Sequence, residues 1–169
     1  MLNALRRRKE YRLKAANLHA ALVARAREPV FFAIFGVEDT LDGRFDLIVL
    51  HAWLVLDRLK GGPLSQAFVD CVFIGFDEAL RELGAGDIGM GKRVKKLADA
   101  FYGRMQAYGE ATNEASMEAA LVRNLYRGKP DAGASALAQY ILRAQERLKA
   151  CDAEEGQLDF GPLPQEVTK

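Results

Sequence analysis

The stretch that decides the fold is RFDLIVLHAWLVLDRLK, residues 44–60, because it is apolar on nearly every side when wound as a helix. Such a helix belongs in the middle of a protein core, since no face of it is suited to water. Its apolar run contains Asp46 and His51 and falls short of the roughly 20 residues that a bilayer span requires. We therefore predict a central buried helix and no membrane span.

Five further segments predict helices around this one. In each, apolar residues recur at spacings of three and four, the pattern of a helix with one buried face. No part of the chain alternates polar and apolar residues for long enough to predict a strand. The segments are 3–28, 64–83, 91–109, 113–127 and 134–151. We predict an all-α fold, a single compact bundle of about six helices.

Polar residues mark two of the helix starts. Asp42 is expected to be the N-cap of the central helix, and Thr112 or Asn113 that of the helix at 113–127, with Ser116 and Glu118 close behind. At the other end of segment 64–83, the apolar stripe predicts that Leu83 faces the core.

Charge is distributed unevenly along the chain. The net charge is +1, yet residues 1–28 contain eight Lys or Arg against two Asp or Glu, which gives that segment +6 and the remainder −5. We therefore distinguish a basic N-terminal helix, 1–28, from a helical domain, 29–151. Residues 152–169 are acidic and lack periodicity, so we predict a mobile tail.

The basic helix suggests a docking role. Several Lys and Arg side chains attract it to an anionic membrane surface or to ribosomal RNA, with a salt-sensitive affinity. Its apolar face is mostly alanine, which is weak for membrane insertion. The residues that would dock are Arg6, Arg7, Arg8, Lys9, Arg12 and Lys14.

Two cysteines and the start of the chain bear on its compartment. Cys71 and Cys151 lie far apart without metal-binding spacing, which favours a reducing environment. The arginines at 6–8 are not followed by the apolar run of a secretory signal. We expect a cytoplasmic protein.

Residues 84–92, GAGDIGMGK, imitate two phosphate-binding motifs. Gly84, Gly86 and Gly89 spell G-x-G-x-x-G, and Gly91 with Lys92 completes most of a P-loop. Both motifs need a preceding strand, whereas the residues before Gly84 predict a helix. A P-loop also needs a hydroxyl after its lysine, and Arg93 stands there. A nucleotide-binding enzyme that uses residues 84–92 is therefore the less favoured alternative.

Four cations follow this glycine segment in the first turns of a predicted helix. The helix macrodipole opposes positive charge there, so helix stability does not explain them. An acidic partner is the natural explanation, and a solvated face is an equally open one. The four are Lys92, Arg93, Lys95 and Lys96.

The sequence shows no group of residues that together could act as nucleophile, base and orienting group in catalysis. His19 and His51 have no recognisable companion, so a hydrogen-bonded core histidine is favoured for His51 over a ligand or a base. Arg44 and Asp46 are expected either to cap the central helix or to pair with the connector that carries Glu38 and Asp39.

Two long strings resemble the ubiquinol–cytochrome c chaperone family, the assembly factors for cytochrome b of the respiratory bc1 complex. They are GVEDTLDGRFDLIVLHAWLVLDRL, residues 36–59, and FIGFDEALRELGAGDIGMGKRVKKLADAFYGRMQAY, residues 73–108. Each short motif in these strings is weak alone, but the motifs together in this order are specific. They are DGRFDL, LH, LRE, GD, GKRVKK and FYGR. The resemblance covers the chain from about residue 29 to about residue 147.

The resemblance implies an all-helical chaperone that holds newly made cytochrome b near the ribosome and the membrane. It implies no catalysis and no nucleotide. The residues themselves give no reason to expect a cofactor or a metal. We expect no DNA and no small-molecule substrate as partners, and a monomer. Mitochondrial members carry a leader, whereas this chain begins almost at its first helix. A bacterial protein is therefore expected, cytoplasmic or peripheral at the inner face of the cytoplasmic membrane.

The resemblance also indicates which residues would contact the client protein. In the second string they are Arg81, Glu82, Asp87, Lys92, Arg93, Lys95, Lys96, Tyr102 and Arg104, and in the first string Arg44, Asp46 and His51. The alternative is that Asp87 caps a turn, Tyr102 and Arg104 pack and pair locally, and only the lysines face a partner. A ribosome- or RNA-docking adaptor is the alternative function.

Overall fold

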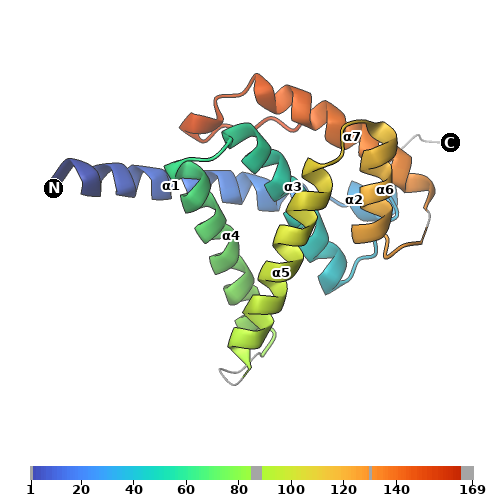
Figure 1. Ribbon diagram of the computed structural model, residues 1–169, viewed down its shortest axis with the longest axis horizontal. Helices are drawn as coiled ribbons and strands as arrows, with labels where there is room; N and C mark the ends of the chain where they lie inside the picture. The colour runs from blue at the N-terminus through green and yellow to red at the C-terminus, as the bar shows by residue number, and fades with distance from the viewer. Residues whose placement is uncertain (1, 85–88, 130, 165–169) are drawn as a thin grey trace.

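The computed structural model describes residues 2–84, 89–129 and 131–164, and every regular element in these ranges is helical (Figure 1). The predicted all-α fold is confirmed, and each of the six predicted helices is present with ends shifted by a few residues. A four-residue helix and a 3₁₀ turn accompany them. The elements are α1 (Leu2–Ala26), α2 (Val30–Ala33), α3 (Leu41–Leu59), α4 (Pro63–Glu82), α5 (Met90–Gly109), α6 (Glu114–Asn124), α7 (Ala132–Lys149) and η1 (Ala153–Glu155).

Helix α3 lies at the centre and packs against α1, α4, α5 and α7. Its residues 49–55 are all buried, as the apolar pattern predicts. The predicted cap is wrong, however. Thr40 has the extended backbone of an N-cap and accepts a hydrogen bond from the Gly43 amide at 3.1 Å. Asp42 lies in the first turn, where its negative charge suits the helix dipole.

Two parts of the molecule extend from this body in Figure 1. The N-terminal half of α1 continues beyond it on the left. Helices α4 and α5 run antiparallel and converge downward towards the turn that joins them, and Phe73 of α4 contacts Phe101 of α5 with ring centroids 5.2 Å apart. We call α4 and α5 together the hairpin. Leu83, at its lower end, is 61% exposed, so the prediction that it faces the core is wrong.

The second half of α1 belongs to the core. Ala15, Leu18 and Leu22 are wholly buried, because this face packs along α4 and α3. Gly75 of α4 allows the close approach, since a Cβ atom there would lie 3.0 Å from the His19 ring. No described helix is both long enough and apolar enough to span a membrane.

Residues 152–164 pack against the body, which corrects the prediction of a mobile tail for this part of it. Ala153 and Phe160 are buried, and the Arg25 guanidinium donates a hydrogen bond to the Gly161 carbonyl. An ion pair joins Asp159 to Arg147 of α7. Ala153 and Phe160 are not part of a run of apolar residues at helical spacing, so the sequence pattern did not predict their burial. Residues 165–169 lie outside the described residues.

Candidate functional site

The hairpin presents a group of cations near its turn. Lys92, Arg93, Lys95 and Lys96 are all exposed in the first two turns of α5, and within the described residues none of them forms an ion pair. The helix offers them no local compensation, because no acidic side chain lies in its first turn and its N-cap, Gly89, makes no side-chain bond. The positive charge is thus left available to a partner.

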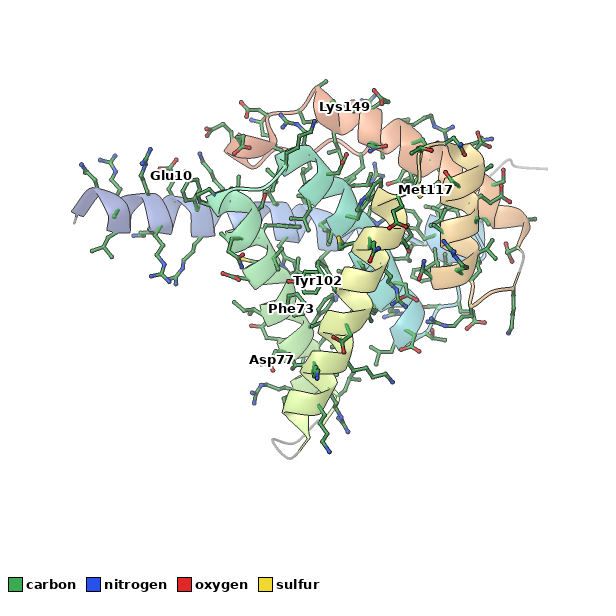
Figure 2. The ribbon with its side chains drawn as sticks, viewed as in Figure 1. Glu10, Phe73, Asp77, Tyr102, Met117 and Lys149 are labelled. Atoms are coloured by element: carbon green, nitrogen blue, oxygen red, sulfur yellow. The ribbon has the colours of Figure 1, made fainter. Side chains whose placement is uncertain are left out.

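An aromatic side chain lies on the same helix face as part of this charge. Tyr102 is 57% exposed, and its ring stacks on Phe73 of α4 with centroids 6.3 Å apart and planes at 26°. Figure 2 shows Phe73 and Tyr102 between the two helices. Lys95 and Tyr102 are seven residues apart and therefore share one face of α5. We call Lys92, Arg93, Lys95, Lys96 and Tyr102 the hairpin surface.

Other predicted contact residues of the hairpin differ in their surroundings. Arg81 pairs with Asp77, one turn away on α4, at 2.9 Å. Glu82 is exposed. Asp87 and Gly86 lie outside the described residues, so the prediction for Asp87 rests on sequence alone.

Asp46 and Arg104 are buried partners inside the protein. The Asp46 carboxylate is wholly buried in α3, 2.8 Å from Arg104 Nη2 of α5 and 3.0 Å from Arg127 Nη2, which follows α6. Arg104 also donates to the Ala100 carbonyl and lies over the Phe45 ring. Burial raises the pKa of Asp46 to about 6, and the two guanidiniums oppose that rise. Both residues therefore join helices inside the protein. Asp46 neither caps α3 nor pairs with the connector of Glu38 and Asp39, and its burial corrects its inclusion among the client contacts.

Arg127 is a member of this buried cluster that sequence reasoning missed. It has a left-handed backbone, with φ 56°, in the break between α6 and α7. In the sequence it is the last residue of the predicted helix 113–127, next to Gly128, and that position says nothing of a partner 81 residues earlier in the chain.

His51 is a core residue, which confirms the favoured interpretation and corrects its inclusion among client contacts. Its Nδ1–H donates to the Leu47 carbonyl at 2.8 Å, and its Nε2 lies 3.1 Å from the Tyr140 hydroxyl. Burial lowers the pKa of His51 to about 4, so the ring is neutral. Phe31 and Phe160 pack edge-on against it, and a partner cannot reach it.

Arg44 lies on the surface and pairs with Asp39 of the preceding connector at 2.7 Å. This confirms the expectation that the connector would supply its partner. Such an exposed pair contributes little to stability.

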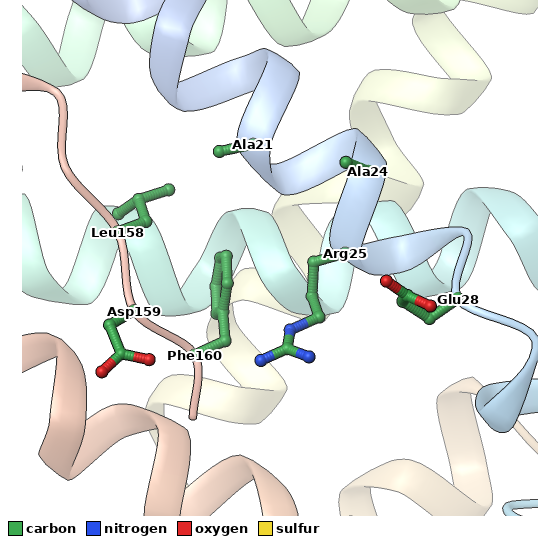
Figure 3. Close-up of a pocket in the computed structure, with 7 residues that line it drawn as sticks. All are labelled: Ala21, Ala24, Arg25, Glu28, Leu158, Asp159 and Phe160. Atoms are coloured by element: carbon green, nitrogen blue, oxygen red, sulfur yellow. The ribbon is translucent and has the colours of Figure 1, made fainter. Parts of the chain in front are cut away.

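A shallow pocket lies beside the tail, where Leu158, Asp159 and Phe160 cross α1 (Figure 3). Arg25 forms its other side, with the guanidinium carbon 5.6 Å from the centre of the Phe160 ring. The lining holds two alanines, two apolar tail residues and the charged Arg25, Glu28 and Asp159, and it contains no Ser, Cys or His.

Neither a metal site nor a phosphate loop is seen in the parts of the chain that the structure describes. No group of three or more His, Cys, Asp and Glu side chains there could hold a metal ion. Helix α4 precedes the glycine segment, and the left-handed Gly84 and Gly89 flank the turn between two helices. The strand that a nucleotide motif requires is replaced by a helix, as predicted.

The predicted docking residues lie on the N-terminal half of α1. Arg6, Arg7, Arg8, Lys9 and Arg12 are exposed. Lys14 is held by Glu10 at 2.9 Å and by Glu155 of η1 at 3.1 Å, so it fastens the helix to the body.

Comparison with known proteins places this architecture. The sequence model of the ubiquinol-cytochrome C chaperone family matches residues 33–155. The ubiquinol-cytochrome-c reductase complex assembly factor 1 of Xenopus laevis is 22% identical over 165 residues, which cover 90% of this chain and 82% of the frog protein. The crystal structure of the Cbp3 homolog from Brucella abortus is 36% identical, with a TM-score of 0.81 over 96% of this chain and 97% of that one. Since the match takes in most of the sequence and the whole helical arrangement, this chain belongs to the ubiquinol–cytochrome c chaperone family, a family of assembly factors for the bc1 complex and not of enzymes.

Proposed function

We propose that this chaperone binds newly made cytochrome b during assembly of the bc1 complex, and that the hairpin surface meets that client. The observation that carries the proposal is the group of exposed cations beside the exposed Tyr102 ring, none of which pairs with an acid among the residues that the structure describes. Cytochrome b is a membrane protein, so before insertion it exposes apolar segments to water. A surface that combines an aromatic ring with mobile cations suits a partner that is apolar in part and polar in its loops.

The energetics of α5 support a role in binding. Four cations in its first turns cost the isolated helix stability, because the dipole repels them. A negative group on the partner would reverse the sign of that interaction. Binding would then gain from charges that folding alone disfavours.

Crosslinking in cells tests this contact. A photoreactive residue at position 95 should attach to cytochrome b, whereas the same residue at Lys149, at the far end of α7 in Figure 2, should not. Equal attachment at both positions, or none at position 95, would overturn the proposed surface.

Charge reversal tests the function. Lys92, Lys95 and Lys96 changed together to Glu should lower the amount of assembled bc1 complex. The variant's melting temperature should stay the same or rise, because acidic residues suit the start of a helix. Reversal of the exposed Arg123, Arg143 and Lys149 is the matched control. Normal complex levels in the Lys92 variant would refute the proposal.

We also propose that the protein works in a bacterium, at the inner face of the cytoplasmic membrane, with Arg6, Arg7, Arg8, Lys9 and Arg12 of α1 contacting a polyanion, while the paired Lys14 is left out of that contact. The greater identity to the Brucella abortus chain than to the frog protein supports the first part. Exposed cations along the projecting helix support the second. Ribosomal RNA and anionic lipid are the two polyanions that the sequence suggests.

A further inference from the structure

The projecting half of α1 has an outer face that none of the other described elements covers. Before the half-buried Tyr11, every described side chain of this helix is exposed. Beyond Tyr11, the inward face of Ala15, Leu18 and Leu22 is buried on the body, whereas Leu13, Ala16 and Ala20 on the opposite side are exposed. Figure 1 shows this half of α1 clear of the other helices.

Two leucines lie on this outer face. Leu5 is 62% and Leu13 is 64% exposed, among the most exposed large apolar side chains of the described chain. Helical geometry places them with the exposed Ala16 and Ala20, roughly opposite the buried Leu18. The sequence suggested a weak, alanine-rich apolar face. Of the alanines of α1, only Ala15 and Ala26 are buried, and the two leucines add larger apolar side chains to the exposed side.

Cations surround the leucines. Arg6 and Lys9 share the outer face, and Arg12 borders it, all three exposed. The one acidic residue of the projecting segment, Glu10, is held by Lys14 at 2.9 Å. The outer face therefore presents two apolar side chains within a field of uncompensated positive charge.

This combination decides between the two polyanions. Phosphate contacts to RNA need cations alone and leave Leu5 and Leu13 unexplained. A bilayer with anionic headgroups accepts both groups: apolar side chains enter the boundary of headgroups and acyl chains, while long basic side chains extend to the phosphates. We propose that the outer face of α1, formed by Leu5, Arg6, Lys9, Leu13, Ala16 and Ala20, lies on an anionic lipid bilayer. This inference rests on the polyanion contact proposed above and names its partner.

The ion pairs of Lys14 give the docked helix a mechanical role. Lys14 joins α1 to Glu155 of η1, and the buried face joins it to α3 and α4. A helix fastened in this way transmits its orientation on the membrane to the whole body. The hairpin is then held in one direction relative to the bilayer.

Vesicle flotation of the full chain tests the proposal. The wild type should float with phosphatidylcholine vesicles that contain phosphatidylglycerol, lose that association in high salt, and stay behind with pure phosphatidylcholine. Leu5→Ser with Leu13→Ser should lower the bound fraction by about tenfold or more, because two apolar side chains no longer leave water. Leu41→Ser, at a 57% exposed leucine of α3, is the matched control and should float like the wild type.

A parallel measurement with labelled single-stranded RNA separates lipid from RNA. The leucine variant should keep any RNA affinity of the wild type, whereas Arg6→Glu with Lys9→Glu should lose vesicle binding. Failure of the wild type to float, or flotation of the leucine variant at the wild-type level, would overturn the membrane assignment. Crosslinking of cytochrome b at position 95 is read out separately, so failure of one proposal is distinguishable from failure of the other.

Discussion

The carboxylate of Asp46 lies 2.8 Å from the guanidinium of Arg104, and this buried contact joins the central helix to the middle of α5. Burial raises the pKa of Asp46, and Arg104 is the first of the groups that oppose the rise. Because α5 also carries the hairpin surface, the ion pair connects the proposed client contact to the core.

Replacement of Arg104 by methionine should destabilise the protein by about 3–5 kcal/mol at pH 8, since it leaves a buried carboxylate with one partly exposed partner. The pKa of Asp46 should rise above its present value of about 6. The folded variant then binds a proton that the unfolded chain lacks. The loss of unfolding free energy relative to the wild type should therefore shrink as the pH falls towards 5. Urea unfolding at both pH values measures this.

Arg44→Met serves as the control for that experiment. Its partner Asp39 is 53% exposed, so the loss should be within about 1 kcal/mol. A deficit of Arg104→Met that stays constant with pH would contradict the coupling to Asp46.

His51 should make stability depend on pH in the opposite direction. Its pKa falls from 6.5 to about 4 in the folded state, so between these values the unfolded chain binds a proton that the folded protein does not. Stability from this group is complete above pH 6.5 and is lost as the pH falls, at up to about 1.4 kcal/mol for each pH unit.

The comparison with His51→Gln isolates that effect. The difference in unfolding free energy between wild type and variant should narrow from pH 7 to pH 4.5, as urea titrations would show. A difference that is the same at both pH values would mean that His51 does not titrate in this window.

Gly43 is expected to tolerate no side chain. A Cβ atom there would lie 2.0 Å from the Glu38 carbonyl oxygen, so Gly43→Ala must displace the backbone and should cost 1–3 kcal/mol or more, roughly the range of overpacked sites. Thermal unfolding measures the loss.

Gly103→Ala is the matched substitution in the interior of α5. Nothing lies within 4 Å of its added methyl group, so the variant should gain about 0.5–1 kcal/mol from helix propensity. If the two alanine variants melted alike, the close approach at Gly43 would be refuted.

Phe160→Ala should remove the ring that covers His51 on one side of the core. The ring is 6% exposed and its centroid lies 5.4 Å from that of His51, so truncation should cost about 3–5 kcal/mol. Water admitted beside His51 should raise the pKa of its ring towards the ordinary value, which NMR titration of the imidazole would detect. Leu41→Ala, at an exposed position, should change neither quantity.

Sequence patterns predicted those features whose physical cause lies within a few residues, such as helices, caps and short-range ion pairs. The all-round apolar residues 44–60 identified the central helix, and Asn113 with Ser116 forms the predicted capping box. The pairing of Arg44 with Asp39 could be predicted, because Asp39 lies only five residues before Arg44 in the connector that leads into the helix. The exposed cations of α5 also follow from sequence, because they conflict with the helix dipole wherever the helix lies.

Contacts between distant segments could not be predicted in this way. Asp46 meets Arg104 and Arg127 only once α3, α5 and the α6–α7 connector are placed in space. Phe160 is buried by a segment without periodicity, and the outward direction of Leu5 depends on which face of α1 packs on α4. In each case the missing information is the relative position of helices, which single-helix periodicity does not contain.

The contact between the Phe160 and His51 rings limits when the core can form during synthesis of the protein. The aromatic cluster around His51 draws on residues from Phe31 to Phe160, so a growing chain cannot close it until position 160 has left the ribosomal exit tunnel. Shorter nascent chains can form α1 and α3 and still lack one side of their interior. This chaperone thus completes its own core only after the segment that carries Phe160 has been made.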